Sequence, residues 1–181
     1  MRKTTTGIPS IFQFAKIHKG FTIVELAIVI AVIGILATIT VVSYRAVQDK
    51  SHDTAVQSDL SNIADQYELY YASKGVYPYG DVLNNASAFS LDIKKASYDT
   101  SQSYQLLNCT SSSSPGSDYA ILAVSKSGKK FYTSSLEGGV RQYTGTATWL
   151  TLSSCTSIKS GFGATGAGYS TATGWRVWTS S

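Results

Sequence analysis

The stretch GFTIVELAIVIAVIGILATITVVSY, residues 20–44, is the segment around which the rest of the chain is organised. Between residues 21 and 44 every side chain is apolar, small or hydroxyl-bearing, except Glu25. As a helix this segment would be about 36 Å long, enough to cross the hydrocarbon core of a bilayer with some tilt. A carboxylate inside such a run is unfavourable unless it has a partner. Glu25 is therefore either a first-turn residue near the membrane surface and the helix dipole or a functional group.

The residues before this stretch are basic. They contain no acid and four Lys or Arg side chains, Arg2, Lys3, Lys16 and Lys19. The order of basic segment, glycine, aromatic residue, glutamate four positions later and unbroken apolar helix resembles the class III leader of type IV prepilins and type II secretion pseudopilins. The resemblance implies that a prepilin peptidase in the membrane cuts between Gly20 and Phe21 and methylates the new amino group of Phe21. It also implies that Glu25 pairs with the Phe21 amine of a neighbouring subunit in a filament, because a carboxylate in apolar surroundings needs a cationic partner.

The formal net charge of +4 comes entirely from this leader. Four of the 15 Lys and Arg residues lie within residues 1–20, which leaves 11 against the 11 Asp and Glu residues. The remainder is therefore neutral, and its composition does not indicate a general polyanion-binding surface. The basic leader is expected to stay in the cytoplasm, and no A-x-A-like cleavage site follows the apolar run near Tyr44. We thus expect the helix to remain as an anchor and everything after it to lie outside the cytoplasm.

The helix is expected to continue beyond Tyr44. Residues 45–74 contain no Pro or Gly, and Gly75 and Pro78 then end the helix. This part carries an apolar stripe at spacings of four and three residues, formed by Val56, Leu60, Ile63, Tyr67 and Tyr70. A helix of about 50 residues, or about 80 Å, is too long for one small domain to bury. The first half should protrude and the second half should pack on a sheet, with a coiled coil as the alternative.

A second segment, YYASKGVYPYG at residues 70–80, is also similar to pilin-class proteins, in which Gly-x-Tyr-Pro commonly ends the long helix and opens the head domain. Its tyrosines are expected to pack the helix end on the core. Many pilins carry a proline within the apolar helix, whereas none occurs here. Helix melting on assembly is therefore less strongly encoded, with Gly34 as its favoured place.

The remaining sequence predicts short strands joined by tight turns. Residues 81–103 should form a loop with a short helix near 90–96. Strands are expected at 104–108, 119–125, 130–135, 140–143 and 148–152. Consecutive strands of this kind predict an antiparallel sheet whose apolar face receives the helix stripe. The predicted fold class is α+β and pilin-like: one long N-terminal helix, packed by its C-terminal half on a small antiparallel β-sheet.

Four segments follow from these expectations. They are a cleaved leader (1–20), a transmembrane or filament-core helix (21–44), an amphipathic stem (45–75) and a head of loops and antiparallel sheet (76–181). From Ser160 the head is rich in Gly, Ser and Thr and contains Trp175 and Trp178. We expect this tail to pack as a last strand on the sheet; an exposed adhesive edge is the alternative.

Cys109 and Cys155 both lie in the exported part of the chain. An oxidising compartment and an even count favour a disulfide between them, with two free buried thiols as the alternative. No His/Cys cluster that would suggest a metal site accompanies them.

No motif for catalysis or cofactor binding is present. After the leader the only histidine is His52, and the chain has no phosphate-binding loop, dinucleotide fingerprint or HExxH. The acidic C-terminal loop with which major secretion pseudopilins often hold calcium is not matched. The sequence therefore predicts a protein that is not an enzyme and has no cofactor. A basic cluster around the turn after residue 125 leaves a DNA-contacting minor pilin open, although the nucleic-acid signal is not strong. Its members are Lys126, Lys129, Lys130 and Arg141.

Together these features predict a structural prepilin subunit of a type IV pilus or related filament. It would be a single-pass protein of the cytoplasmic membrane with its head outside, and later part of an extracellular filament on a prokaryotic cell surface. The resemblance implies as partners further copies of the chain, the peptidase, and the pilus assembly platform with its ATPase. The alternatives are a minor pilin or adhesin, a competence (DNA-uptake) pseudopilin, a type II secretion pseudopilin, and a membrane-anchored domain that never polymerises.

Overall fold

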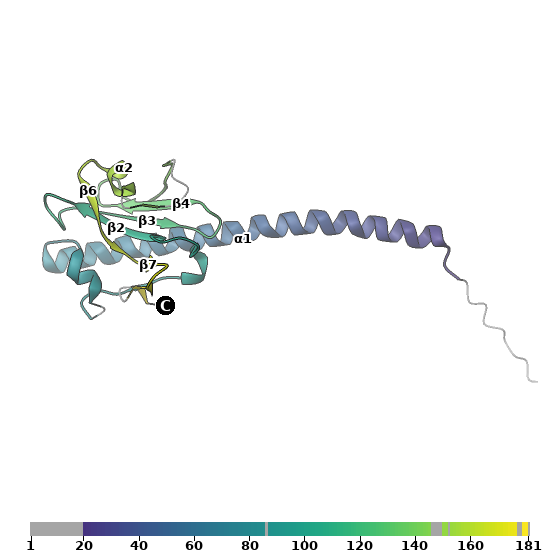
Figure 1. Ribbon diagram of the computed structural model, residues 1–181, viewed down its shortest axis with the longest axis horizontal. Coiled ribbons are helices and arrows are strands. Elements are labelled where there is room, and N and C mark those ends of the chain that lie inside the picture. Colours follow the sequence, from purple (N-terminus) through teal and green to yellow (C-terminus); the bar gives the residue numbers. More distant parts are fainter. Residues whose placement is uncertain (1–19, 86, 146–149, 152, 177–178, 181) are drawn as a thin grey trace, which may run out of the picture. The chain divides into compact units, whose positions relative to one another are not determined.

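The computed structural model describes residues 20–85, 87–145, 150–151, 153–176 and 179–180 (Figure 1). The chain divides into two compact units, Met1–Val42 and Ser43–Ser181. Helix α1 (Ile23–Lys74) begins in the first unit and ends in the second. The predicted leader lies outside the described residues, apart from Gly20.

In the first unit, every described residue of α1 is exposed. This part is helical because apolar residues follow one another without a break, and because its hydroxyl groups bond within the helix. Thr38 Oγ1 donates to the carbonyl oxygen of Ile35 at 2.7 Å, and Thr40 Oγ1 to that of Leu36 at 2.8 Å. By length and composition, α1 contains a segment that is long and apolar enough to cross a membrane, and none of that segment is buried within the chain.

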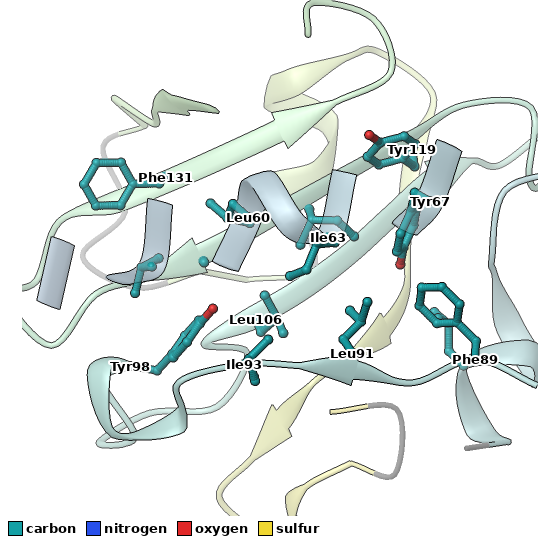
Figure 2. Packing of buried hydrophobic residues seen from close by; sticks show 14 of the residues in the cluster. Leu60, Ile63, Tyr67, Phe89, Leu91, Ile93, Tyr98, Leu106, Tyr119 and Phe131 are labelled. Carbon is teal, nitrogen blue, oxygen red and sulfur yellow. The ribbon is translucent and has the colours of Figure 1, made fainter. Parts of the chain in front are cut away.

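In the second unit, α1 buries one face. Val56, Leu60, Ile63 and Tyr67 are at most 1% exposed, and Tyr70 packs half-buried against the same cluster. The predicted stripe is therefore the side of the helix that contacts the core, and Figure 2 shows several of its residues above the sheet. After Lys74 the helix ends at Gly75, which has a φ of +74° and donates its N–H to the Tyr71 carbonyl at 2.7 Å. Glycine adopts this left-handed conformation without strain, as is common where helices end.

The head is built on a five-stranded antiparallel sheet in the order β5-β4-β3-β2-β6. Its strands are β2 (Leu106–Ser111), β3 (Tyr119–Val124), β4 (Lys130–Ser134), β5 (Val140–Gln142) and β6 (Phe162–Ala167). Successive residues of β2 and β3 point to opposite faces, and both faces are buried. Leu106 and Ile121 pack under α1, whereas Leu107 and Leu122 join a second cluster on the far face, beside α2 (Ser154–Ile158). The α+β, pilin-like fold class is thereby confirmed.

The short helix predicted near residues 90–96 is wrong in most of its length. Leu91 and Ile93 are buried and Asp92 is exposed, which is the alternation of a strand. β1 (Leu91–Asp92) accordingly pairs in parallel with β9 (Thr179–Ser180). Only the 3-10 turn η2 (Lys95–Ser97) is helical there, and a second 3-10 turn, η1 (Gly80–Asn84), follows α1.

The Gly-rich tail packs on the head differently from the prediction. Strand β6 supplies the fifth strand of the main sheet, and β7 (Tyr169–Ser170) pairs with β8 (Gly174–Trp175) in a separate hairpin. The glycines permit close packing, because a Cβ on Gly163 would lie 2.8 Å from Ser112 Oγ. Trp175 is half-buried.

Trp178 and most of the strand predicted at 148–152 lie outside the described residues. Helix α2 was not predicted.

Candidate functional site at the start of the helix

The first turn of α1 is closed by reciprocal hydrogen bonds between Thr22 and Glu25. Glu25 Oε2 accepts the Thr22 N–H at 2.9 Å and the Thr22 hydroxyl at 2.8 Å, and the Glu25 N–H donates to Thr22 Oγ1 at 3.2 Å. This arrangement is a capping box, which satisfies amide groups that have no partner at a helix N-terminus. Sequence reasoning missed Thr22, although Thr-x-x-Glu before an apolar run is a known signature of such a cap.

The carboxylate of Glu25 thus has local and neutral partners. None of the ion pairs formed among the described residues includes it. Phe21, the residue before Thr22, is 90% exposed, and nothing lies within 4 Å of a Cβ built on Gly20. The bond between Gly20 and Phe21 precedes the helix, so a peptidase would find it outside regular secondary structure. The site therefore combines an open peptide bond with a carboxylate that is four residues away and lacks a cation.

Two of the carboxylates on the stem of α1, Asp53 and Asp59, are buried. Asp53 accepts hydrogen bonds from Lys129 Nζ, at 2.7 Å, and from the Ser127 hydroxyl. Asp59 Oδ2 accepts the Lys94 N–H at 2.8 Å and the Tyr98 hydroxyl at 3.1 Å. These bonds fasten the helix to the β3–β4 turn and to the segment around η2. Their donors lie 35 to 76 residues away in the sequence.

The two stem carboxylates differ in acidity. Burial raises the pKa of Asp53, but the hydrogen bonds from Lys129 and Ser127 outweigh burial and hold this pKa below its usual value. Burial also raises the pKa of Asp59, and there the hydrogen bonds from Lys94 and Tyr98 do not compensate, so this pKa stays above its usual value. The ammonium group of Lys129 contributes to this difference, because it pairs with Asp53, whereas Asp59 has no ion pair among the described residues.

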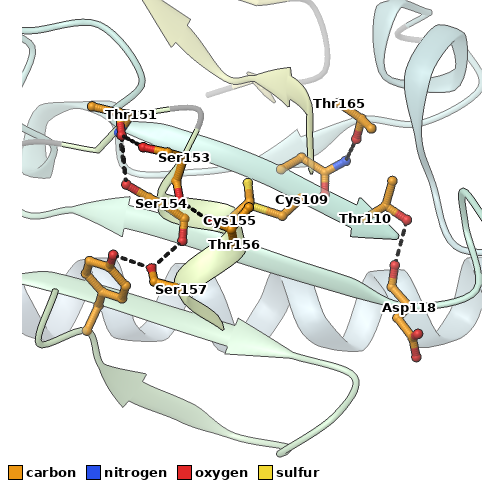
Figure 3. The surroundings of a disulfide bond; sticks show 12 residues. Cys109, Thr110, Asp118, Thr151, Ser153, Ser154, Cys155, Thr156, Ser157 and Thr165 are labelled. Atoms are coloured by element: carbon orange, nitrogen blue, oxygen red, sulfur yellow. Dashed lines mark hydrogen bonds between the residues drawn. A yellow bond between two sulfur atoms is a disulfide. The ribbon is translucent and has the colours of Figure 1, made fainter. Parts of the chain in front are cut away.

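Cys109 of β2 and Cys155 of α2 form a disulfide, with their Cα atoms 5.6 Å apart (Figure 3). Both residues are fully buried. The bond holds α2 on the face of the sheet opposite α1, where the Tyr143 hydroxyl also bonds Ser157 Oγ at 2.6 Å. With 46 residues between the cysteines, loop closure contributes about 4 kcal/mol in the chain-entropy account.

The basic cluster predicted around the β3–β4 turn is largely engaged. Lys129 pairs with Asp53, and Arg141 Nε lies 3.3 Å from Glu137 Oε2. Lys130 Nζ donates to the Gly145 carbonyl at 3.3 Å. Among the described residues, no group of three or more His, Cys, Asp or Glu side chains could hold a metal ion.

One comparison with known proteins concerns the same end of the chain. The family described as "Prokaryotic N-terminal methylation motif" matches residues 16–41. The chain is 28% identical over 122 residues to the type IV wide pilus major component PilA4 of Thermus thermophilus, covering 67% of this chain and 85% of that protein. It is 38% identical over 63 residues to the fimbrial protein EcpC of Eikenella corrodens, covering 35% of this chain and 41% of EcpC. It is 51% identical over 44 residues to a type IV major alpha-pilin of Moraxella bovis, covering 24% of this chain and 28% of that pilin. No solved structure gives a significant match.

The matched motif, the capped apolar helix and the α+β head are the features of the prepilin class of proteins. Within that class, the matched motif and the likeness to pilus proteins support assignment to the type IV pilin family. The match spans less than half the length of EcpC and of the Moraxella pilin.

Proposed function

We propose that this pilin is cut between Gly20 and Phe21, methylated on the Phe21 amine, and assembled through its N-terminal helix into a type IV pilus or related filament. The observation that carries the proposal is the start of α1, where a single carboxylate without a cation begins an apolar helix inside the matched methylation motif. Cleavage at this bond would create a positive charge four residues from Glu25.

Assembly then follows from the chemistry of both groups. An ionised carboxylate has about four acceptor positions, so Glu25 can accept an ammonium group from another subunit while Thr22 still donates to it. The apolar side chains of the helix would move from lipid into a bundle of like helices, which is feasible because both surroundings are apolar. The ion pair would then set the register of each added subunit, because only one axial offset brings the two charges together.

The partners and the route come from the family. We infer a prepilin peptidase, an assembly platform and its ATPase, and residence in the cytoplasmic membrane with the head outside before assembly into a surface filament. The relatives named above are pilus or fimbrial proteins, and PilA4 is named as a major component of a wide pilus. These names favour a filament subunit over a secretion or competence role.

The test is the intact mass of the chain in filaments sheared from the cell surface. We expect a mass that begins at a methylated Phe21. In a Gly20→Arg variant, a large charged side chain replaces the small residue at the cut, and we expect only the uncut chain, retained in the membrane. The exposed Gly34, changed to Ala, is the matched control and should be cut normally. Mature-length protein from Gly20→Arg would refute the assigned bond, and a mature chain never found in filaments would refute assembly.

A further inference from the structure

We propose that the end of the head around residues 45–50 of α1 is a lipid-binding surface, which contacts the phosphate groups of an anionic membrane while the chain is membrane-embedded. We name this surface the basic collar. It consists of Arg45, Lys50, Lys94, Lys95 and Lys126. The inference rests on the membrane-resident stage of the proposed function and does not depend on filament assembly.

The first part of the collar follows the apolar segment directly. Tyr44 is the last residue of the apolar run, and Arg45 is the next residue. Lys50 lies about 7.5 Å beyond Arg45 along the helix axis, and both cations are exposed. Tyr44 and Val47 are 62% and 67% exposed. Tyrosine is enriched where membranes meet water, so these turns of α1 have the composition of a segment at headgroup level.

Two loops bring the remaining lysines to the same turns of the helix. Lys94 and Lys50 line one groove of about 620 Å³, together with Val47. The Lys126 N–H donates to the Ser97 carbonyl at 2.8 Å, which joins the β3–β4 turn to the segment around η2. Figure 1 allows this turn to be followed between β3 and β4. The collar thus gathers cations from three separate parts of the sequence on one end of the folded unit.

The acids near the collar reduce its charge without cancelling it. Asp53 is paired with Lys129, and Asp59 is buried. With Asp59 counted, four acids (Asp49, Asp59, Asp92 and Asp99) remain against the five collar cations, an excess of one positive charge. A positive surface at headgroup level is attracted to anionic lipid, and the attraction acts over about 8–10 Å at ordinary ionic strength.

The other end of the head has the opposite character. Asp65 and Glu68 lie exposed on the last turns of α1, and Asp118 follows the β2–β3 loop, where it pairs with Lys159 at 3.2 Å. The chain without its leader is neutral, so the positive excess belongs to the collar and not to the whole surface. This distribution favours a partner that is negative and lies beside the apolar segment. A lipid surface meets both conditions.

The experiment measures lysine acetylation in the full chain embedded in lipid nanodiscs. One set of discs contains phosphatidylcholine alone, and the other also contains phosphatidylglycerol. Mass spectrometry follows each lysine separately, and Lys74 and Lys159, at the far end of the head, serve as internal controls. In the anionic discs we expect collar lysines to react up to about fivefold more slowly, and the controls to be unchanged. At 1 M salt the protection should disappear, because the screening length falls to about 3 Å.

A variant pair tests whether the collar acts as one surface. Lys94→Gln combined with Lys95→Gln should weaken the protection of Lys126 in anionic discs, whereas Lys74→Gln should leave it unchanged. Equal acetylation of collar and control lysines in both kinds of disc would overturn the proposal. Protection that arises only after assembly into filaments would also overturn it, in favour of contact with a neighbouring subunit. Protection in a chain that is neither cut nor assembled would uphold it even if the proposed function failed.

Discussion

The two halves of α1 differ in which of their faces carry apolar side chains. In the first half every face is apolar and exposed, as at Ile33, which is 58% exposed. In the second half one stripe is apolar and buried, as at Leu60, which is fully buried against the sheet. The second half is therefore stabilised by contacts within the chain. The first half must obtain its burial from lipid or from other helices.

The carboxylates of the two halves differ in the same way. Asp53 and Asp59 bond donors from distant parts of the head, whereas Glu25 bonds only its own turn of helix in the described chain. Asp53 and Asp59 thus stabilise the packing of the helix on the head, whereas Glu25 keeps acceptor capacity for a second molecule. This difference supports the proposal that the second half of the helix serves folding and the first half serves assembly.

Replacing Glu25 should give the largest effect, the loss of filaments. We expect Glu25→Ala to be cut normally and to leave the head folded, because the hydrogen bonds of this side chain among the described residues stay within the first turn of α1. Filaments on the cell surface should be absent by electron microscopy, since the cationic N-terminus would have no partner.

Glu25→Gln separates charge from capping. Glutamine can fill the same position in a capping box, so this variant keeps the helix start and removes the charge. We expect it to fail in assembly as completely as Glu25→Ala. Normal filaments from Glu25→Gln would show that the cap, and not the charge, is what assembly requires.

A buried leucine in the stem should have the next largest effect. Leu60→Ala leaves a cavity under α1 and should lower the free energy of unfolding of the head by about 3 kcal/mol. Leu36→Ala is the matched control, because Leu36 is 58% exposed in the other half of the same helix. We expect no change from it in denaturant unfolding of the detergent-solubilised chain. Equal destabilisation by both changes would mean that the two halves unfold as one unit.

The division of the helix was predictable because it depends on spacing along the sequence. An unbroken apolar run and a stripe at intervals of three and four residues are both local patterns. Gly20, Phe21 and Glu25 came from a motif of adjacent residues for the same reason. The burial of Asp53 was not predictable, since its partner Lys129 is 76 residues away and both read as residues of a solvated face.

The tail packs on the head as expected, but the part of it that joins the main sheet, residues 162–167, was not identified, for another physical reason. Residues 162–167 are small and Gly-rich, and such composition normally indicates a flexible segment. Here the lack of side chains is what lets β6 lie against neighbours such as Ser112 and, at Gly166, Leu83. Composition alone does not reveal whether a close neighbour exists.

Asp53→Asn should have a moderate effect that depends on pH. At neutral pH it removes the charge of a buried group paired with Lys129, and we expect a loss of about 1–2 kcal/mol in unfolding free energy. The pKa of Asp53 is lower in the folded chain than in the unfolded chain, where it is near 3.8. The carboxylate therefore stabilises the folded chain at pH values above the unfolded pKa, and this stabilisation is lost as the pH falls through the folded pKa. The difference between wild type and variant should therefore shrink in acid.

Asp59→Asn is the control of opposite sign. The pKa of Asp59 is raised in the folded chain, so its contribution to stability is present below the unfolded value and is lost as the pH rises through the folded one. The free energy of unfolding of Asp59→Asn, relative to wild type, should thus rise from acid to neutral pH, while that of Asp53→Asn falls. Parallel pH profiles from the two variants would contradict the assigned environments.

Thr22→Val should produce the smallest change, because it removes one hydroxyl from the cap and leaves the Thr22 N–H bonded to Glu25. Loss of a capping side chain costs about 1 kcal/mol, so amide hydrogen exchange in the first turn of α1 should become about fivefold faster in detergent micelles. Thr22→Ser keeps the hydroxyl and should exchange like the wild type. We expect filaments from both variants, since the Glu25 carboxylate remains available to a neighbouring amine. If Thr22→Val abolished filaments as Glu25→Ala should, the cap itself would hold the carboxylate in the position that assembly needs. The first half of the helix would then resemble the second in depending on a contact made within the chain.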